Sequence, residues 1–433
     1  MKAFETYEDA RDWLYSLKNR GSTYGIERME RFAARLGNPQ NAYPVIHIAG
    51  TNGKGSTAAM LEAIFRAHGY RTGLSTSPHL VRQGERIQVD RQITSEQQIL
   101  EYTRRLKVVG DRIALEDPEM HPSFFEFMTG MAFLRFKEAE VDVAIVEVGL
   151  GGRLDATNVV DPEVSAITSI GLDHCEILGD TLAEIAREKG GIIKSGRPVV
   201  VGDLPEEASQ AIRGLCAERG CDLVSIGDRF EERGEAYPKT NLAGGYQRLN
   251  AAVALTVAEQ VQQKFNLDLA LCRSALTRVD WPGRWEERQL VNRKIIFDVS
   301  HNAEGARWLE ASLARMAESG EPAPDVVMGV MGEYRAQALV PVVARFARSI
   351  TFVVPGQSRA TAFEALERAV PSTFKGDVRR SSVAELFPGK GRCVMDEASD
   401  HPILVTGSIY LIGEVWERFF EDSPVGQGVL QDF

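Results

Sequence analysis

A glycine-rich segment with a single lysine is the part of this sequence best suited to binding a phosphate. The segment runs from Gly50 to Ser56 (G-T-N-G-K-G-S), between a β-branched run at 45–49 and a helix-period stretch at 56–67. Glycines let successive backbone N–H groups point at one anion, and the N-terminus of the following helix adds the positive end of its dipole. Lys54 adds a full charge. This order of strand, loop, lysine and helix predicts a phosphate-binding loop.

One extra residue separates this loop from the common P-loop pattern. Gly55 stands between Lys54 and Ser56, whereas G-x-x-x-x-G-K-[ST] places the hydroxyl directly after the lysine. The insertion disfavours an ordinary GTPase or kinase, although Ser56 still offers a hydroxyl where a Walker-type loop uses one near Mg²⁺. A glycine-rich connector without a ligand is the alternative interpretation.

Two polar residues at the ends of later apolar runs predict a metal site. Glu147 lies near the end of the run 141–148, and His174 follows the run 164–170. The carboxyl ends of parallel strands meet at one edge of a sheet, where a nucleotide-bound Mg²⁺ finds its ligands. Asp173 competes with His174 as the ligand. For Glu147 the alternative is a solvent-facing strand end, and for His174 it is a structural histidine.

Lys189 lies where a helical pattern runs into Gly190 and Gly191. If it is buried near a metal, desolvation disfavours its charged form and leaves a neutral, nucleophilic amine. Such an amine can capture CO₂ as a carbamate, an anion that suits a Mg²⁺ shell. The residue by itself fits an ordinary surface lysine better.

Strands that alternate with helices must position these residues, and this alternation predicts doubly wound α/β architecture. A second series of strands begins after Pro282 and Gly283, with runs at 294–299, 325–330, 349–354 and 402–406. We therefore expect two doubly wound domains, an N-terminal P-loop ATPase domain over 1–282 and a smaller Rossmann-like domain over 283–433. One large sheet, with Pro282-Gly283 as an ordinary loop, is the alternative.

The composition disfavours several classes of protein. The 433 residues carry 50 Lys and Arg against 61 Asp and Glu, a net charge of −11 that disfavours nucleic-acid binding. The five cysteines are odd in number and form no C-x-x-C pair, which disfavours a disulfide framework and a structural zinc site. No run approaches 18 consecutive apolar residues, and the acidic N-terminal segment lacks the pattern of a secretory signal. We expect a cytoplasmic protein that contacts neither nucleic acid nor membrane.

Taken together, the motifs resemble those of the folylpolyglutamate and dihydrofolate synthases of the Mur ligase superfamily. The loop is similar to that superfamily's G-T-N-G-K-[GS]-[ST] signature, which includes the extra residue. Further similar segments occur in family order between residues 24 and 410, at 75–80, 85–87, 123–127, 147–158, 173–174, 188–189, 248–252, 282–284, 298–302 and 405–410. The family often has D-G-A-H-N where 298–302 reads D-V-S-H-N, and the polar positions are retained.

The resemblance implies a role for individual residues. The first domain would bind ATP and the pterin-bearing substrate, and the second would bring glutamate contacts. The implied ATP contacts are Thr51, Asn52, Gly53, Lys54, Gly55, Ser56, Asn250, Arg284 and Asp298. The implied Mg²⁺ ligands are Ser77, Glu147 and His174, beside a carbamylated Lys189. The implied glutamate contacts are Arg86, His301, Ser408 and Tyr410, and the implied pterin contacts are Tyr24, Phe124 and Phe125.

The implied reaction is ATP-dependent ligation of L-glutamate to a folate through an acyl phosphate. The acceptor would be a tetrahydrofolate, dihydropteroate or both, and Lys54, Lys189 and His301 would be the catalytic residues. His301 is a candidate proton acceptor, with a purely binding role as the alternative. Another Mur-type amino-acid ligase is disfavoured because muramyl-peptide ligases carry an extra domain before the loop, which here begins at Gly50. A P-loop module that binds nucleotide without ligation is the other alternative, and we expect a monomer.

Overall fold

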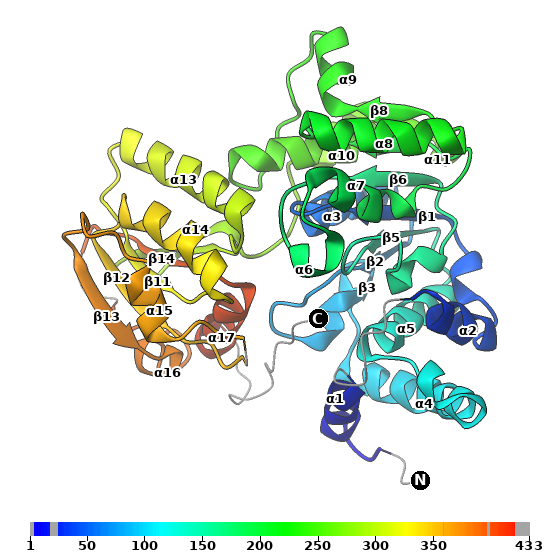
Figure 1. Cartoon of the computed structure of the whole chain (residues 1–433), viewed down its shortest axis with the longest axis horizontal. Coiled ribbons are helices and arrows are strands. Elements are labelled where there is room, and N and C mark those ends of the chain that lie inside the picture. The colour runs from blue at the N-terminus through cyan, green and yellow to red at the C-terminus, as the bar shows by residue number, and fades with distance from the viewer. Residues whose placement is uncertain (1–3, 18–24, 358, 396–398, 421–433) are drawn as a thin grey trace.

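The structure is a computed structural model that describes residues 4–17, 25–357, 359–395 and 399–420. Two sheets organise these residues, and Figure 1 shows them side by side with helices packed around each. The strands of the first sheet are β1 (Val45–Ala49), β2 (Thr72–Ser75), β3 (Ile87–Val89), β4 (Gln92–Ile93), β5 (Val143–Glu147), β6 (Val164–Ile167), β7 (Val199–Val201) and β8 (Leu223–Ser225). The strands of the second are β9 (Arg284–Gln289), β10 (Lys294–Asp298), β11 (Asp325–Met328), β12 (Ser349–Val353), β13 (Asp377–Ser381) and β14 (Ile403–Thr406).

The first sheet has the order β4-β3-β2-β5-β1-β6-β7-β8. The six neighbouring strands β2, β5, β1, β6, β7 and β8 pair in parallel. Every residue of β1 and β5 is buried because helices cover both faces of the sheet. The helices around it are α1 (Tyr7–Ser16), α2 (Glu27–Arg35), α3 (Lys54–Ala67), α4 (Glu96–Glu116), α5 (Phe124–Glu138), α6 (Cys175–Leu178), α7 (Leu182–Lys189), α8 (Glu206–Arg219), α9 (Ile226–Glu232), α10 (Gly245–Gln260), α11 (Gln262–Phe265) and α12 (Leu269–Ala275). Short 3₁₀ helices lie at Pro39–Asn41, Gln83–Arg86, Pro118–Met120, Ala156–Val159 and Gly190–Ile192.

Three large apolar cores pack against this sheet; one of them lies between α7, α8 and the strands β6 and β7, and the other two fix the central strands. One of these two joins α3, α10 and α12 to one face, and Phe65 is fully buried in it. The other joins α1, α2, α4 and α5 to the opposite face, where Phe127 and Phe133 are fully buried. Because helices on both faces fix β1 and β5, the loops at the carboxyl ends of these strands are held in a defined position.

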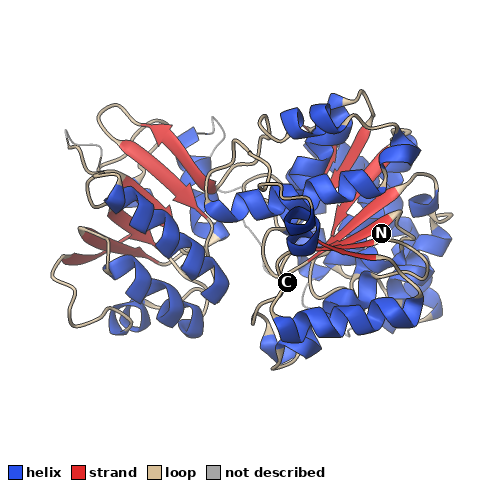
Figure 2. Ribbon diagram, turned by 90° about the horizontal axis from the view of Figure 1, so that it is seen from above, coloured by secondary structure: helices blue, strands red, loops and turns tan. Residues whose placement is uncertain are grey.

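The second sheet has the order β13-β12-β11-β14-β10-β9 and is parallel except for β9. Its helices are α13 (Ala303–Glu318), α14 (Glu333–Ala344), α15 (Phe363–Arg368), α16 (Val383–Leu386) and α17 (Ile409–Phe420). Figure 2 shows this smaller sheet separated from the larger one by helices and loops. The second sheet begins with β9 at Arg284, and the expected domain boundary at 283 stays a prediction. The parts of the chain that fold around the first and the second sheet are called the first and the second domain.

The α/β class with two doubly wound sheets is confirmed, and each sheet carries antiparallel strands at one edge. β3 and β4 form an antiparallel hairpin around Asp90 and Arg91, both at positive φ, and β9 pairs antiparallel with β10. A two-residue turn of this kind is usually signalled by Asn-Gly or Asp-Gly, and Asp90-Arg91 lacks the glycine. Within the described ranges, no helix is long and apolar enough to cross a bilayer.

Candidate functional site

The predicted phosphate-binding loop connects β1 to α3 and is shaped by two glycines. Gly50 and Gly53 both have positive φ, at 151° and 86°. A Cβ on Gly53 would collide with the side-chain amide of Asn250, and one on Gly50 would collide with the Thr168 hydroxyl. The absence of a side chain at Gly53 therefore lets α10 approach the loop directly, with Asn250 against its turn, and its absence at Gly50 lets the segment after β6 approach.

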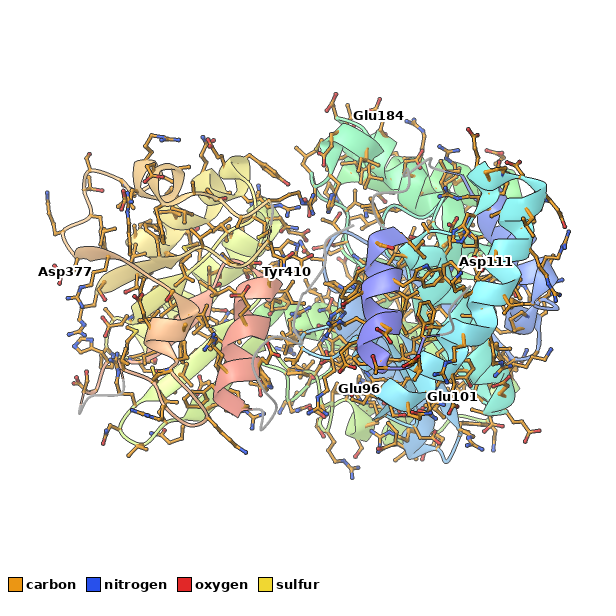
Figure 3. The ribbon with its side chains drawn as sticks, turned by 90° about the horizontal axis from the view of Figure 1, so that it is seen from below. Glu96, Glu101, Asp111, Glu184, Asp377 and Tyr410 are labelled. Carbon is orange, nitrogen blue, oxygen red and sulfur yellow. The ribbon has the colours of Figure 1, made fainter. Side chains whose placement is uncertain are left out.

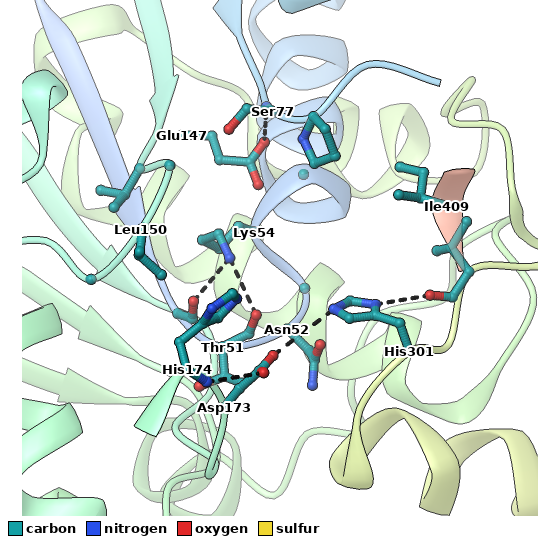
Figure 4. A pocket seen from close by; sticks show the side chains of 18 of the residues that line it. Thr51, Asn52, Lys54, Ser77, Glu147, Leu150, Asp173, His174, His301 and Ile409 are labelled. Carbon is teal, nitrogen blue, oxygen red and sulfur yellow. Dashed lines mark hydrogen bonds and ion pairs between the residues drawn. The ribbon is translucent and has the colours of Figure 1, made fainter. Parts of the chain in front are cut away.

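Lys54 is the first residue of α3, and its ammonium group folds back over the loop (Figure 4). Its Nζ donates to the carbonyl oxygens of Gly50 at 3.0 Å and Thr51 at 3.2 Å. These acceptors are neutral, and hydrogen bonds from an ammonium group to a charged phosphate oxygen are stronger. The lysine is thus placed to exchange carbonyl oxygens for phosphate oxygens.

A buried corner beside the loop has the chemistry of a hard-cation site. The backbone N–H of Ser77 donates to Glu147 Oε2 at 3.0 Å, and burial raises the pKa of the Glu147 carboxyl to about 7. The Ser77 hydroxyl is buried, and no described residue hydrogen-bonds to it. A carboxylate and a free hydroxyl oxygen are ligands that Mg²⁺ accepts. The residues present therefore fit a divalent cation.

His174 follows β6 and lines the same cavity as Ser77 and Glu147. In Figure 4 it lies on the opposite side of the Lys54 ammonium from Glu147. Among the described residues, no three His, Cys, Asp or Glu side chains gather as a metal-binding group. A cation here would depend on the Ser77 hydroxyl and on ligands from the substrates.

Lys189 ends α7 inside the protein, about 5 % exposed. Its Nζ donates to the Gly50 carbonyl at 3.0 Å, so the amine touches the phosphate-binding loop. Burial, helped by the nearby charge of Lys54, lowers the pKa of Lys189 to about 7. A large fraction of the amine is therefore neutral at neutral pH.

The second domain supplies the other wall of the cavity through Arg284, His301, Ser408 and Tyr410. Figure 3 shows Tyr410 on the side of this domain that faces the first. His301 Nδ1 lies 3.0 Å from the Val299 carbonyl, which can only accept, so Nδ1 carries the proton and Nε2 keeps a lone pair. Burial lowers the pKa of His301 to about 4, so the ring is neutral at neutral pH.

Three of the expected ATP contacts lie behind the cavity wall in this structure. The Ser56 hydroxyl accepts a hydrogen bond from Gln247 Nε2 at 3.3 Å, and Asn250 Nδ2 donates to Gln247 Oε1 at 3.0 Å. The Asp298 carboxylate accepts from the backbone N–H groups of Ser300 at 3.0 Å and Trp285 at 3.2 Å. All three residues shape the loops around the site, and their contacts with ATP stay predictions.

Two of the expected pterin contacts, Phe124 and Phe125, lie on the first domain together with Arg86, which was expected to contact glutamate. Arg86 is buried, its guanidinium carbon lies 5.4 Å from the Phe124 ring centroid, and its Nε hydrogen-bonds to His79 Nδ1 at 2.8 Å. A Cβ on Gly149 would lie 2.5 Å from the Phe125 ring, so Phe125 borders the loop after Glu147. Tyr24 lies outside the described residues.

Sequence reasoning missed one set of polar contacts at the cavity. Arg335 donates to Asp173 Oδ1 at 2.8 Å, and Asn302 Nδ2 donates to Asp173 Oδ2 at 2.9 Å. Burial alone would raise the pKa of Asp173, but the charge of Arg335 holds it below its ordinary value. Arg335 and Asp173 are 162 positions apart and share no local motif, so no signal in the sequence pointed to the pair.

Comparison with known proteins identifies relatives that match most of the chain. A model of the Mur ligase middle domain matches residues 48–266, half of the chain. The dihydrofolate synthase/folylpolyglutamate synthase of Bacillus subtilis is 34% identical over 439 residues, covering 96% of this chain and 99% of that protein.

Solved structures agree over nearly the full length. The folylpolyglutamate synthase of Mycobacterium tuberculosis complexed with ADP has a TM-score of 0.82 at 28% identity, over 96% of this chain and 99% of that one. The bifunctional folylpolyglutamate synthase/dihydrofolate synthase of Yersinia pestis, complexed with AMPPNP and a Mn ion, has a TM-score of 0.80 at 29% identity, over 96% and 98%. The chain therefore belongs to the Mur ligase family, among its folylpolyglutamate and dihydrofolate synthases.

Proposed function

We propose that this chain, an ATP-dependent ligase that adds glutamate to folates, activates the folate carboxylate as an acyl phosphate at the Gly50–Ser56 loop. The observation that carries the proposal is one cavity lined from both domains. The loop, Glu147 and Lys189 form one wall, and His301, Ser408 and Tyr410 form the facing wall. An activated carboxylate formed at the first wall would meet an amine held at the second.

The first step joins two anions. A carboxylate oxygen of the folate attacks the γ-phosphorus of ATP, ADP leaves, and the new carboxyl–phosphate bond makes the carbonyl carbon electrophilic. Lys54, Arg284 and the loop N–H groups offset the repulsion between the carboxylate and the phosphate. Both side chains line the cavity and carry the positive charge that this step requires.

Ser77, Glu147 and His174 are the residues that would hold a divalent cation. The Ser77 hydroxyl, to which none of the described residues hydrogen-bonds, lies beside the Glu147 carboxylate and supports this assignment, and the Yersinia pestis relative is complexed with a Mn ion. Mg²⁺ bound there would neutralise part of the phosphate charge. Since the pKa of Glu147 is raised to about 7, this carboxyl would have to lose its proton near neutral pH before it could hold a cation.

Lys189 is the residue that would carry a carbamate. Its neutral amine attacks CO₂, a C–N bond forms, and one proton is released to solvent. Two features support the reaction at this position: the amine is buried, and its pKa is lowered to about 7. The modification would turn a buried neutral amine into an anion beside the loop that Lys189 contacts through Gly50.

The second step forms the amide bond. The α-amine of glutamate must lose a proton before it attacks the acyl phosphate, and phosphate then leaves. His301 Nε2 keeps a lone pair because Nδ1–H donates a hydrogen bond to the Val299 carbonyl. Nε2 can therefore accept a proton from this amine. We assign His301 this role, with Ser408 and Tyr410 as hydroxyl-bearing contacts for the rest of glutamate.

One assay tests the proposed function. The purified chain is incubated with ATP, Mg²⁺ and L-glutamate, and dihydropteroate or a tetrahydrofolate is offered in separate reactions. We expect phosphate release and a new glutamyl amide only when both glutamate and a folate acceptor are present. Phosphate release that depends on neither would indicate a nucleotide-hydrolysing module instead, and the two acceptors together report whether one or both activities are present.

A further inference from the structure

We propose that five polar residues across the domain boundary form an interdomain latch that positions His301 against the phosphate-binding loop. The latch consists of Asn52 and Asp173 from the first domain, and of Asn302, Glu304 and Arg335 from the second. The inference rests on the proposed function, because it assigns the latch a task in that same reaction. These are positioning residues rather than residues that react.

Asp173 is the centre of the latch. Its Oδ1 accepts from Arg335 at 2.8 Å and from the Tyr334 hydroxyl at 3.3 Å, while its Oδ2 accepts from Asn302 at 2.9 Å. The side chains of Arg335 and Asp173 are only 10% and 8% exposed, so the ion pair is shielded from solvent. Both carboxylate oxygens are therefore engaged by the second domain, which favours an anchoring role for Asp173 over metal ligation.

Asn302 connects the second domain to the phosphate-binding loop itself. Its side chain forms a reciprocal amide pair with Asn52: each Nδ2 donates to the other Oδ1, at 3.1 and 3.2 Å. The Asn302 Oδ1 also caps α13 by accepting from the Gly305 N–H at 2.8 Å. One buried side chain thus fixes both the start of α13 and its distance from the loop.

Glu304, in the first turn of α13, adds a second contact to the same loop. Its Oε2 accepts from Asn52 Nδ2 at 2.7 Å and from the Ser169 hydroxyl at 3.2 Å. Two residues at the start of α13, Asn302 and Glu304, therefore both hydrogen-bond to Asn52. A rotation of either domain would break both contacts together.

The latch can affect catalysis because His301 lies next to it in the chain. His301 directly precedes Asn302, and its Nε2 lies 3.9 Å from Asp173 Oδ2. When the latch is formed, the imidazole has a fixed position relative to the loop that would hold the γ-phosphate. When the latch is broken, an acyl phosphate could form without a correctly placed amine, and water would hydrolyse it.

The test variant is Arg335→Met, which removes the charge and keeps a long side chain. We expect kcat/KM for glutamate to fall about tenfold or more, as for typical coupling between sites. The amount of phosphate released per amide formed should rise above one. The dissociation constant of AMPPNP should change by less than about threefold, because Arg335 is none of the expected ATP contacts and Lys54 keeps its place at the start of α3.

Two variants separate positioning from folding. Arg335→Lys keeps the charge and should recover part of the ligation rate and most of the coupling between phosphate release and amide formation. The matched control is Arg345→Met, on the C-terminal end of the same helix, where Arg345 pairs with Glu310 within the second domain. This control should retain wild-type kinetics. If Arg335→Met folds poorly, the double variant Asp173→Asn/Arg335→Met can be used instead, because it also removes the buried carboxylate that has lost its ion-pair partner. The double variant should lose no more activity than either single variant.

Small-angle scattering tests the latch without relying on ligation. With AMPPNP bound, Arg335→Met should have a larger radius of gyration than the wild type. An unchanged radius together with wild-type kcat/KM and one phosphate per amide would overturn the latch. A wild-type protein that ligates no folate would instead overturn the proposed function, and scattering would still decide whether the latch holds the domains together.

Discussion

Replacing Lys189 with methionine should make the protein more stable and catalytically inactive. The lysine amine is buried beside the phosphate-binding loop, and its pKa falls from 10.5 to about 7 in the folded chain. Methionine has a similar length and no charge to desolvate. The Gly50 carbonyl that loses the lysine keeps the hydrogen bond from Lys54 at 3.0 Å.

The size of the effect follows from proton linkage. Between pH 7 and 10.5 the unfolded chain holds a proton on Lys189 that the folded chain has lost, so stability rises with pH in this window. At about 1.4 kcal/mol per pKa unit, the buried lysine costs about 4 kcal/mol at pH 7. From pH 7 to 9 the wild type should gain about 2 kcal/mol relative to Lys189→Met.

Urea denaturation in CO₂-free buffer at pH 7, 8 and 9 measures this difference in the free energy of unfolding. Lys264→Met is the control, because Lys264 is about half exposed and pairs with Glu163 on the surface. Added bicarbonate should stabilise the wild type and leave Lys189→Met unchanged. A difference between wild type and Lys189→Met that stays constant from pH 7 to 9 would refute the assignment of a neutral buried amine.

Three further substitutions test the cavity. Lys54→Ala should lower ligation about 10²- to 10³-fold without unfolding the chain, as measured by activity and circular dichroism; near-normal turnover would remove the loop from the reaction. For the wild type, the Mg²⁺ concentration needed for half-maximal activity should rise as pH falls below about 7, because protons compete with Mg²⁺ for the Glu147 carboxylate. Glu147→Gln should abolish this pH dependence. His301→Ala should reduce kcat about 10²-fold, and an unchanged pH–rate profile in this variant would dismiss His301 as the proton acceptor.

The parts of this molecule that sequence could predict are those set by local pattern. The β-branched run at 45–49 is a strand because it is buried on both faces, and the loop after it turns where Gly50 and Gly53 permit positive φ. The convergence of Glu147 and His174 on one cavity followed from strand ends that share an edge. In each case a few consecutive residues carried the information.

The rest depends on contacts between distant segments. Nothing near Arg335 in the sequence indicates a partner at Asp173, and the pairing exists only because two domains meet there. The burial of Lys189, which sets its pKa, likewise comes from the packing of α7 against the loop after β1. The edge hairpin at Asp90-Arg91 was missed because its turn lacks a glycine.

Isotope transfer gives the most direct test that a carboxylate is activated by phosphorylation in this cavity. A folate acceptor labelled with ¹⁸O in its reacting carboxylate is ligated to glutamate, and the inorganic phosphate is analysed by mass spectrometry. An acyl phosphate requires that one labelled oxygen leave with each phosphate. Amide formation with unlabelled phosphate would contradict the mechanism.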